Sequence, residues 1–594
     1  MSKQILSGDE AIARGAYEAG CIVATAYPGT PSTEILENIA AYGDAIYSQW
    51  ATNEKVAVEI AIGASIGGAR ALASMKHVGM NVASDPIFSI GYAGVNAGLV
   101  IISADDPGCH SSQNEQDNRN YAPHAKIAML EPADSQECKD FTVAAFELSE
   151  RFDTPVLLRL TTRICHSKSL VETGERKEEG IRPYLRRPEK HAMLPATARS
   201  RHIIREKLLL EMEEYSNNCP FNKIERQPQS RIGIITSGIS YQYSREIFGK
   251  DANYLKIGLS YPLPNKLIAG FAKDMETLYV IEENDPYLEN AVKRLGFSCT
   301  GKDKIPICGE LSTEIIRKAL FNTPDAVFYK SEVKVPPRPP VLCAGCPHRG
   351  FFSTLNKHLS NIVPAGDIGC YSLGFAPPFN GFDFSVCMGA GLSSIIGLSK
   401  ALERQGDKRK ALGMVGDSTF FHSGITSLID IVTSNANVIA CILDNSTTAM
   451  TGHQDHSGTG KTIQGASFPA IDIAALVKAT GISNDRLRIV DPINTEEMNK
   501  AIADGIAING PFIIITKSPC ALLPQVVKAN AGRHCEVDPD ACRGCRACTK
   551  TTCPSIAFIE GKSVIRDRAS CNGCGLCRSQ CKFNAIKRVE AQNG

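Results

Sequence analysis

The spacing of eight cysteines near the C-terminal end is the feature of this 594-residue sequence that most restricts its fold. Two runs of three cysteines repeat at three-residue intervals, and a fourth cysteine follows each run after a few residues. Such short intervals turn several thiolates toward one centre, so both runs predict metal binding rather than a disulfide framework. The eight positions are Cys542, Cys545, Cys548, Cys553, Cys571, Cys574, Cys577 and Cys581.

This spacing is similar to that of two-cluster bacterial ferredoxins, in which the fourth cysteine of each run ligates the cluster of the other run. It departs from them by one extra residue before Cys553 and by Lys582 where proline is usual. A zinc ribbon is the alternative. Cys535 lies outside the pattern and is not expected to be a ligand. One [4Fe–4S] cluster is assigned to Cys542, Cys545, Cys548 and Cys581. The second [4Fe–4S] cluster is assigned to Cys571, Cys574, Cys577 and Cys553.

Two neighbouring apolar runs in the second half of the chain each end in polar residues. The runs at 411–415 and 437–443 are typical of buried parallel strands, and a helix is predicted between them. Strands connected in this way end at the same edge of a sheet, where α/β proteins bind ligands. Asp417 follows the first run and Asn445 follows the second, and their oxygens suit Mg²⁺. Two ordinary strand ends with polar caps are the alternative.

The same segment resembles the thiamine-diphosphate motif, in which Gly-Asp-Gly is followed further along the chain by Asn-Asn. The resemblance implies that Asp417, Asn445 and the Thr447 carbonyl hold Mg²⁺ against the diphosphate. Ser418 replaces the third glycine and Asp444 replaces the first asparagine. The form of the motif in 2-oxoacid:ferredoxin oxidoreductases tolerates both departures. The cofactor-binding positions implied are Gly416, Asp417, Ser418, Asn445 and Thr447.

Glu54 begins a predicted helix that is rich in small residues. A glutamate at a helix start commonly complements the helix dipole. Thiamine enzymes, however, place a glutamate with Ala three and Gly nine residues later, and Ala57 and Gly63 match this. In that family the glutamate hydrogen-bonds N1′ of the aminopyrimidine and favours the imino tautomer that generates the ylid. The role requires a desolvated carboxyl group with a raised pKa, so Glu54 is the predicted catalytic residue.

Four residues are candidates for contact with the substrate. The loop at 26–34 has the Tyr-Pro-x-Thr-Pro-Ser form of related enzymes, which implies that Thr30 faces a substrate carboxylate. His110 and Gln113 lie in a polar loop after a predicted strand, a common place for functional residues, although a solvated turn would look the same. His77 is the fourth candidate, and a hydrogen-bonded core histidine is the alternative.

Cys343 and Cys346 form a Cys-x-x-Cys pair directly after a proline-rich boundary at 335–341. A structural zinc site is one interpretation, but no second pair lies nearby. The resemblance to oxidoreductases implies instead that this loop lies against the cofactor diphosphate through Cys346 and His348. Backbone amides, His348 and Arg349 would suit such an anion.

The predicted fold class is α/β, with several domains. Alternating helical and strand-like segments predict two doubly wound domains and a smaller α/β domain between them. The resemblance implies that these are pyrimidine-binding, diphosphate-binding and transketolase C-terminal-like, and that a two-cluster ferredoxin domain follows. The predicted ranges are 1–175 (pyrimidine-binding), 176–228 (linker with one amphipathic helix), 229–332 (transketolase C-terminal-like), 338–528 (diphosphate-binding) and 533–590 (ferredoxin-like).

Charge and hydropathy exclude several classes of partner. The 64 Lys and Arg residues balance 63 Asp and Glu residues, so no basic field for nucleic acid is expected. No apolar run reaches the length of a membrane span, and the start lacks a signal core. The 22 cysteines favour a reducing compartment, and a cytoplasmic protein is expected.

The whole chain resembles the 2-oxoacid:ferredoxin oxidoreductases, and its domain order is most similar to the alpha subunits of the members that act on aryl 2-oxoacids. The resemblance implies oxidative decarboxylation, with indolepyruvate the expected substrate, coenzyme A the co-substrate and ferredoxin the electron acceptor. The cofactors implied are thiamine diphosphate, Mg²⁺ and two [4Fe–4S] clusters. A separate beta subunit with a gamma-type domain is implied, and hence a hetero-oligomer. The alternatives are another 2-oxoacid such as pyruvate or phenylpyruvate, a non-oxidative thiamine decarboxylase, and an electron-transfer scaffold with a degenerate thiamine site.

Overall fold

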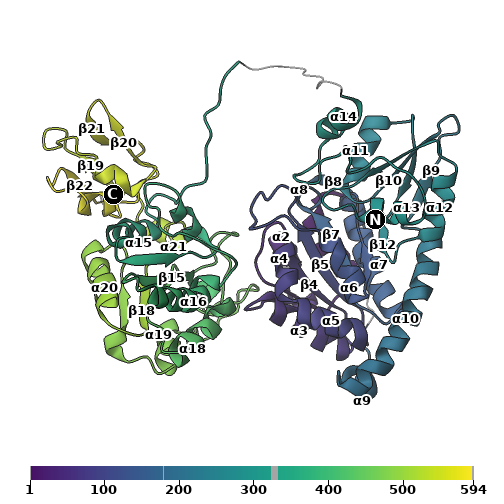
Figure 1. The fold of residues 1–594 in the computed structure, drawn as a ribbon, viewed down its shortest axis with the longest axis horizontal. Helices are drawn as coiled ribbons and strands as arrows, with labels where there is room; N and C mark the ends of the chain where they lie inside the picture. The colour runs from purple at the N-terminus through teal and green to yellow at the C-terminus, as the bar shows by residue number, and fades with distance from the viewer. Residues whose placement is uncertain (1, 178–179, 323–331, 591–594) are drawn as a thin grey trace. The chain divides into compact units, whose positions relative to one another are not determined.

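The computed structural model describes residues 2–177, 180–322 and 332–590, and it divides into two compact units. The first unit extends to Glu332 and includes the short stretch Ile463–Gly465, and the second begins at Val333. Figure 1 colours the first unit from purple to teal and the second from teal to yellow. Among the described residues, no helix is both long and apolar enough to cross a lipid bilayer.

Seven strands form the main sheet of the first unit, in the order β12-β6-β7-β5-β4-β2-β3. Every neighbouring pair is parallel except β12 with β6. The inner strands are almost free of charge, as expected for strands that are covered on both faces. The strands are β2 (Val23–Ala26), β3 (Tyr47–Trp50), β4 (Ala71–Lys76), β5 (Leu99–Asp105), β6 (Ala128–Leu130), β7 (Val156–Thr161) and β12 (Leu259–Tyr261).

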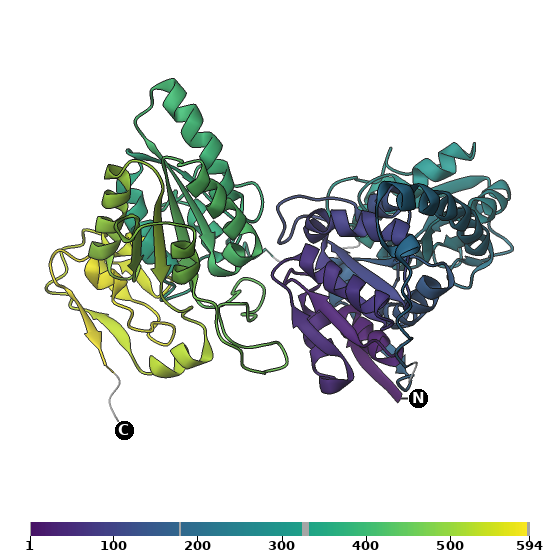
Figure 2. The ribbon, with the colours of Figure 1, turned by 90° about the horizontal axis from the view of Figure 1, so that it is seen from below.

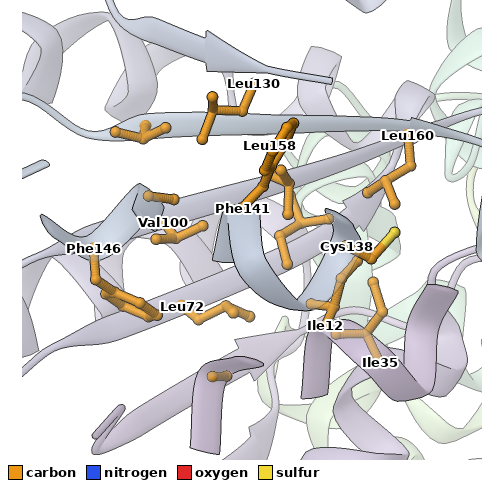
Figure 3. Close-up of a cluster of buried hydrophobic side chains, with 14 of the residues drawn as sticks. Ile12, Ile35, Leu72, Val100, Leu130, Cys138, Phe141, Phe146, Leu158 and Leu160 are labelled. Atoms are coloured by element: carbon orange, nitrogen blue, oxygen red, sulfur yellow. The ribbon is translucent and has the colours of Figure 1, made fainter. Parts of the chain in front are cut away.

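Helices cover both faces of this sheet, because alternate residues of each strand point to opposite sides. Figure 3 shows one of the two cores, in which Leu72, Val100 and Leu158 of the sheet pack against Phe141 and Phe146 of α7. Neighbouring strand residues such as Ala71 and Ile101 belong to the core on the other face. The helices of the first face are α1 (Gly8–Glu18), α2 (Thr33–Ala40) and α7 (Ser135–Arg151), and those of the second are α3 (Glu54–Ile66) and α5 (Ser84–Ala93).

The first unit also contains a four-stranded sheet in the order β13-β10-β11-β9 and an antiparallel pair of β1 (Ser2–Ser7) with β8 (Lys168–Thr173). The middle part of the chain also supplies β12 to the main sheet. The two ranges before residue 332 that were predicted as separate domains therefore contribute strands to the same sheet. The range predicted as a linker contains the long helix α10 and β9. The elements are α10 (Pro195–Asn218), β9 (Lys223–Glu225), β10 (Ile232–Thr236), α11 (Ile239–Phe248), β11 (Asn253–Lys256), α12 (Asn265–Lys273), β13 (Thr277–Ile281), α13 (Tyr287–Arg294) and α14 (Thr313–Phe321).

The second unit is built on a five-stranded parallel sheet in the order β14-β15-β16-β18-β17. Two buried apolar cores cover its two faces, one with α16 and α18 and the other with α15 and α20. The elements are α15 (His348–Leu355), β14 (Ile362–Ala365), α16 (Ala390–Gln405), β15 (Lys410–Gly416), α18 (Ile425–Thr433), β16 (Val438–Asp444), β17 (Leu487–Val490), α20 (Thr495–Ala507) and β18 (Phe512–Lys517).

The cysteine-rich end of the chain packs beside this sheet and is drawn in yellow in Figure 2. It consists of two antiparallel strand pairs and two short helical turns. The outer strand pair joins the start of the segment to its end, and the inner pair lies in the middle of its sequence. Each cysteine run therefore lies between one strand of the outer pair and one strand of the inner pair. The elements are β19 (His534–Val537), η7 (Cys548–Thr551), β20 (Ile556–Ile559), β21 (Lys562–Ile565), α22 (Leu576–Ser579) and β22 (Ile586–Val589).

Candidate active site

Two polar strand ends meet at the carboxyl edge of the sheet in the second unit. β15 ends at Gly416 and is followed by Asp417, and β16 ends at Asp444 and is followed by Asn445. The strands are parallel neighbours with Gly416 opposite Leu443, so their polar ends lie side by side. Both strands therefore lie where the apolar runs of the sequence predict them.

Asn445 and Asp417 belong to a group of converging polar atoms. One terminal atom of the Asn445 carboxamide lies 3.2 Å from Asp417 Oδ1 and 2.8 Å from the Thr447 carbonyl oxygen. If the amide nitrogen occupies that position, both contacts are hydrogen bonds. If the amide oxygen occupies it, three oxygens face one another. Octahedral Mg²⁺ binds oxygen at about 2.1 Å, which places adjacent ligands about 3 Å apart. The second orientation therefore supplies three oxygen donors, and the Asn445 oxygen lies from each of the other two at the spacing of adjacent Mg²⁺ ligands.

The Asp417 carboxylate is buried and held by three neighbours. Its Oδ1 accepts a hydrogen bond of 2.9 Å from the Ser418 amide, and its Oδ2 accepts one of 3.3 Å from the Thr447 amide. His456 Nε2 lies 3.2 Å from the same Oδ2. These contacts fix the plane of the carboxylate, and Oδ1 faces Asn445. The sequence analysis did not select His456, because it lies in a loop without a recognised motif.

Asp444 adds a second carboxyl group beside Asp417. Burial, together with the neighbouring Asp417 carboxylate, raises the pKa of Asp444 to about 6. Its Oδ1 accepts a 3.0 Å hydrogen bond from the Ser446 amide. The departure from the Asn-Asn motif thus replaces a neutral amide by an acid, which increases the negative charge available to a divalent cation at this edge.

The loop that precedes α15 lies against the same edge. His348 is buried, and its ring lies edge-on to the Tyr371 ring with 5.7 Å between centroids. The Tyr371 hydroxyl is 3.2 Å from Thr419 Oγ1, just after Asp417. Burial lowers the pKa of His348 to about 4, so the imidazole is neutral at neutral pH. Burial also raises the pKa of Cys346 to about 12.

Arg349 does not have the anion-binding role that the sequence suggested. Its guanidinium donates hydrogen bonds to the carbonyls of Cys343, at 2.9 Å, and Thr551, at 2.8 Å. The side chain therefore ties the cysteine-rich segment to the loop before α15. Among the described residues, neither Cys343 nor Cys346 belongs to a group of three His, Cys, Asp or Glu ligands with metal-binding spacing, which argues against structural zinc here.

The eight predicted cluster cysteines line two separate small cavities in the cysteine-rich segment. In each cavity the three cysteines of one run meet the fourth cysteine of the other run, the grouping that the ferredoxin-like spacing predicts. The first cavity contains Cys542, Cys545, Cys548 and Cys581. The second cavity contains Cys553, Cys571, Cys574 and Cys577.

The sulfurs of these eight cysteines are spaced more widely than the ligands of a single zinc ion. Tetrahedral Zn²⁺ binds thiolates at about 2.3 Å, which requires sulfurs about 3.8 Å apart. Within the described part of the chain, no three cysteine sulfurs lie within 4.8 Å of one another. Four thiols spread around a cavity fit a larger cluster better than a single ion.

Glu54 lies at the first turn of α3 in the first unit and is only 5% exposed. Asn53 caps this helix by accepting a 2.9 Å hydrogen bond from the Val56 amide. Gly79 lies directly against the glutamate, because a Cβ at that position would be 2.8 Å from Glu54 Oε1. Local capping and one glycine contact therefore position the carboxyl group.

Lys76 and His77 follow at the carboxyl end of β4. Lys76 Nζ donates a 2.8 Å hydrogen bond to the Ser111 carbonyl, and burial lowers its pKa. His77 is buried with Nε2 about 3.1 Å from Asn114 Oδ1, and burial lowers its pKa too. Its Nδ1 is buried without a hydrogen-bond partner among the described residues. Lys76 is a cation near Glu54 that the sequence analysis did not select.

The remaining substrate candidates separate into two groups. Thr30 is half-buried in the loop after β2, and its neighbour Gly29 packs against the Lys76 side chain. Thr30 thus lies at the same sheet edge as His77. His110 and Gln113 are exposed, and His110 Nε2 lies 3.2 Å from Glu310 Oε2 instead. The roles of His110 and Gln113 as substrate contacts therefore remain predictions.

Gly79→Ala should reduce turnover by about tenfold or more, because the new methyl group displaces the Glu54 carboxyl group and small misplacements of reacting groups are costly. Steady-state rates of the variant and the parent enzyme would measure this. Gly270→Ala is the matched control, since a Cβ at Gly270 meets nothing within 4 Å. Equal rates for the two variants would contradict the positioning role of Gly79.

Comparison with known proteins supports the prediction of a cofactor-binding site in this chain. Residues 14–227 match the family described as "Pyruvate flavodoxin/ferredoxin oxidoreductase, thiamine diP-bdg". Residues 367–516 match "Thiamine pyrophosphate enzyme, C-terminal TPP binding domain". The sequence is 39% identical to the indolepyruvate oxidoreductase subunit IorA of Archaeoglobus fulgidus, over 99% of this chain and 98% of that protein. It is 38% identical to the IorA subunit of Pyrococcus abyssi, over 98% and 97%.

A solved structure of 2-oxoglutarate:ferredoxin oxidoreductase from Magnetococcus marinus also matches, with 18% identity, a TM-score of 0.44, and coverage of 53% of this chain and 64% of that one. The fold and the two matched families define a thiamine-diphosphate enzyme of the 2-oxoacid:ferredoxin oxidoreductase class. Within this class, the chain belongs to the family of the indolepyruvate oxidoreductase subunit IorA. The predicted resemblance is confirmed.

Proposed function

We propose that this chain is the thiamine-binding subunit of an enzyme that oxidatively decarboxylates an aryl 2-oxoacid, with indolepyruvate as substrate. The products are carbon dioxide and the aryl-acetyl ester of coenzyme A, and two electrons pass to ferredoxin. The observation that carries the proposal is the oxygen group of Asp417, Asn445 and Thr447, in one unit with two four-thiol cavities. Names of relatives that match nearly the whole chain support indolepyruvate as the substrate.

Asp417, Asn445 and the Thr447 carbonyl would hold Mg²⁺, with Gly416 and Ser418 at the start of the following turn. Cys346 and His348 lie on the loop beside this edge, and the neutral His348 ring can donate one hydrogen bond to an anionic ligand. Bound thiamine diphosphate would supply a carbanion as the nucleophile for the 2-oxo carbon and a thiazolium ring as the electron sink for loss of carbon dioxide. The residues of this chain bind and orient that group.

In the first unit, Glu54 would hold a proton at its carboxyl group and exchange it with the cofactor ring. Its burial suits this role, because water is largely excluded from the carboxyl group. Thr30 and His77, at the same sheet edge, would contact the substrate. His110 and Gln113, in the loop after β5, are proposed as further contacts to the substrate.

Two [4Fe–4S] clusters would occupy the thiol cavities and supply one-electron acceptors. The second cavity is also lined by Ala344, Gly345 and Cys346. The loop beside the proposed Mg²⁺ ligands therefore reaches the second cluster site. A single loop thus touches both sites. This arrangement favours an oxidative enzyme over a non-oxidative decarboxylase, in which a cysteine-rich segment so close to the cofactor would have no role.

A beta subunit with a gamma-type domain is proposed to complete a hetero-oligomer, because the relatives are named as subunits of an oxidoreductase. The balance of 64 basic and 63 acidic residues gives no reason to expect nucleic acid as a partner, and no membrane partner is proposed. We propose a cytoplasmic location, because oxygen-sensitive clusters and 22 cysteines require a reducing environment.

An anaerobic assay of the complex with its beta subunit tests the proposed function. Pyruvate, 2-oxoglutarate, phenylpyruvate and indolepyruvate are each supplied with coenzyme A, and viologen reduction and carbon dioxide are measured together. The expected result is equivalent viologen reduction and decarboxylation, fastest with indolepyruvate. Carbon dioxide release without viologen reduction would support the non-oxidative alternative, and fastest reaction with pyruvate would overturn the substrate assignment.

Asp417→Asn should weaken binding of Mg²⁺ and thiamine diphosphate by about 100-fold, because the change removes the only negative charge of the proposed ligand set. Binding is measured by quenching of protein fluorescence on addition of the cofactor with Mg²⁺. Asp430→Asn, on an exposed face of α18, is the control. Cofactor affinity equal to that of the parent would contradict the assignment of Asp417.

A further inference from the structure

Two cysteines besides the four assigned ligands line the second thiol cavity: Cys346, on the loop before α15, and Cys535. Cys535 is on β19, is 1% exposed, and lines the cavity that holds Cys553 and the second cysteine run. Its position is fixed by the pairing of β19 with β22, in which it lies opposite Arg588. The sequence pattern excluded Cys535 as a ligand because of its spacing, yet the fold places its thiol among the four assigned ones.

Two contacts connect Cys535 to the second cysteine run. Its backbone amide donates a hydrogen bond of 3.3 Å to Cys571 Sγ. Its thiol lies beside the sulfurs of both Cys571 and Cys577. Cys535 therefore lies next to two assigned ligands, on a strand whose register is set by its pairing with β22.

The first cavity has a comparable neighbour in a different chemical form. Ser563 is buried there, and its Oγ lies 3.1 Å from Cys548 Sγ. A [4Fe–4S] cluster takes four thiolates, so Ser563 and Cys535 are each additional to the four assigned ligands of their cavity. The additional group is a hydroxyl in the first cavity and a thiol in the second.

We propose that Cys535 is a positioning residue of the second cluster, which donates hydrogen bonds from its amide and its thiol to the sulfurs of Cys571 and Cys577 without ligating iron. Donors to cysteine sulfur stabilise the reduced cluster, because reduction adds negative charge that is shared by the sulfurs. The Cys535 thiol thus raises the reduction potential of the second cluster and leaves that of the first unchanged. This inference rests on the iron–sulfur assignment in the proposed function.

The test compares Cys535→Ala, Cys535→Ser and the parent as the anaerobic full-length chain with its beta subunit. Iron per chain is measured, and electron paramagnetic resonance follows both clusters during a redox titration. Cys535→Ala should retain all of the iron and move one midpoint potential to a more negative value. Cys535→Ser keeps a donor of similar size, so its potential should equal or exceed that of the parent. Cys308→Ala, which removes an exposed cysteine, is the control and should change nothing.

Three results would overturn the inference. Loss of about half of the iron in Cys535→Ala and retention in Cys535→Ser would make Cys535 a ligand. Unchanged potentials in Cys535→Ala with full iron would make it a bystander, and an equal negative shift in both variants would assign the effect to packing. Absence of iron from the parent itself would instead refute the proposed function, so the two failures are distinguishable.

Discussion

Glu54→Gln should reduce turnover with the best 2-oxoacid by about 10³-fold, within the range that proton-transfer groups contribute. The substitution preserves shape and hydrogen-bonding size but replaces a carboxyl group that can hold or release a proton by an amide that cannot. Because Glu54 is buried at the start of α3, water cannot readily substitute for it. The measurement is the anaerobic rate of viologen reduction, together with the iron content.

Iron content and cofactor affinity should be almost unchanged in this variant, because the proposed ligands of both groups lie in the second unit. Glu59→Gln is the matched control: Glu59 is on the same helix, but it is exposed and paired with Lys55. Its activity should equal that of the parent. Full activity of Glu54→Gln would instead favour an electron-transfer scaffold in which the thiamine site is degenerate.

Arg119→Met should destabilise the first unit by about 3–5 kcal/mol, because it breaks a buried ion pair and leaves carboxylates without a partner. Arg119 is 1% exposed, and its guanidinium contacts Asp117 and, at 2.6 Å, Glu282. It also donates hydrogen bonds to the carbonyls of Glu283, at 2.7 Å, and Asp285, at 3.0 Å. This side chain therefore connects the loop after β5 to the end of β13.

The acids around Arg119 outnumber the bases. Arg159, the second buried guanidinium, contacts Asp105 at 2.9 Å and Glu131 at 3.0 Å. Burial raises the pKa of Asp105 to about 7 and also raises that of Glu282. Without Arg119, Arg159 alone cannot neutralise the negative charge of these buried carboxylates, and the loss of stability should be large.

Thermal unfolding of the full chain measures this effect, with unfolding of the first unit followed by limited proteolysis. Arg409→Met is the control, since Arg409 pairs with Asp407 at the surface, where such pairs contribute about 1 kcal/mol or less. A decrease in melting temperature no larger than that of the control would show that the buried network does not hold the two sheets of the unit together.

Local sequence patterns predicted the parts of the site that lie on regular elements. The apolar runs at 411–415 and 437–443 are the strands β15 and β16, and Asp417 and Asn445 follow them as expected. These predictions hold because strand periodicity and the parallel connection restrict where the ends can lie. The grouping of cysteines in the two cavities follows in the same way from short intervals on tight turns.

Contacts between distant segments could not be predicted in this way. His456 contacts Asp417 from a loop without a motif, and Arg349 contacts Thr551 across about two hundred positions of sequence. Cys535 enters the second cavity only because β19 pairs with β22. His110 lies in the expected loop, and its ring nitrogen contacts Glu310, which is 200 positions further along the chain. Each of these contacts depends on tertiary packing, and a single sequence contains no local pattern that predicts it.

The strand β12 determines which pieces of this protein can exist alone. It comes from the middle of the chain, yet it pairs with β6 at the border of the main sheet. A fragment that stops before Leu259 would leave β6 as an exposed edge strand with unpaired backbone groups. Such edge strands pair with other chains and aggregate. Shuffling or truncation of this gene must therefore keep the first 261 residues together, and shorter products should aggregate rather than fold.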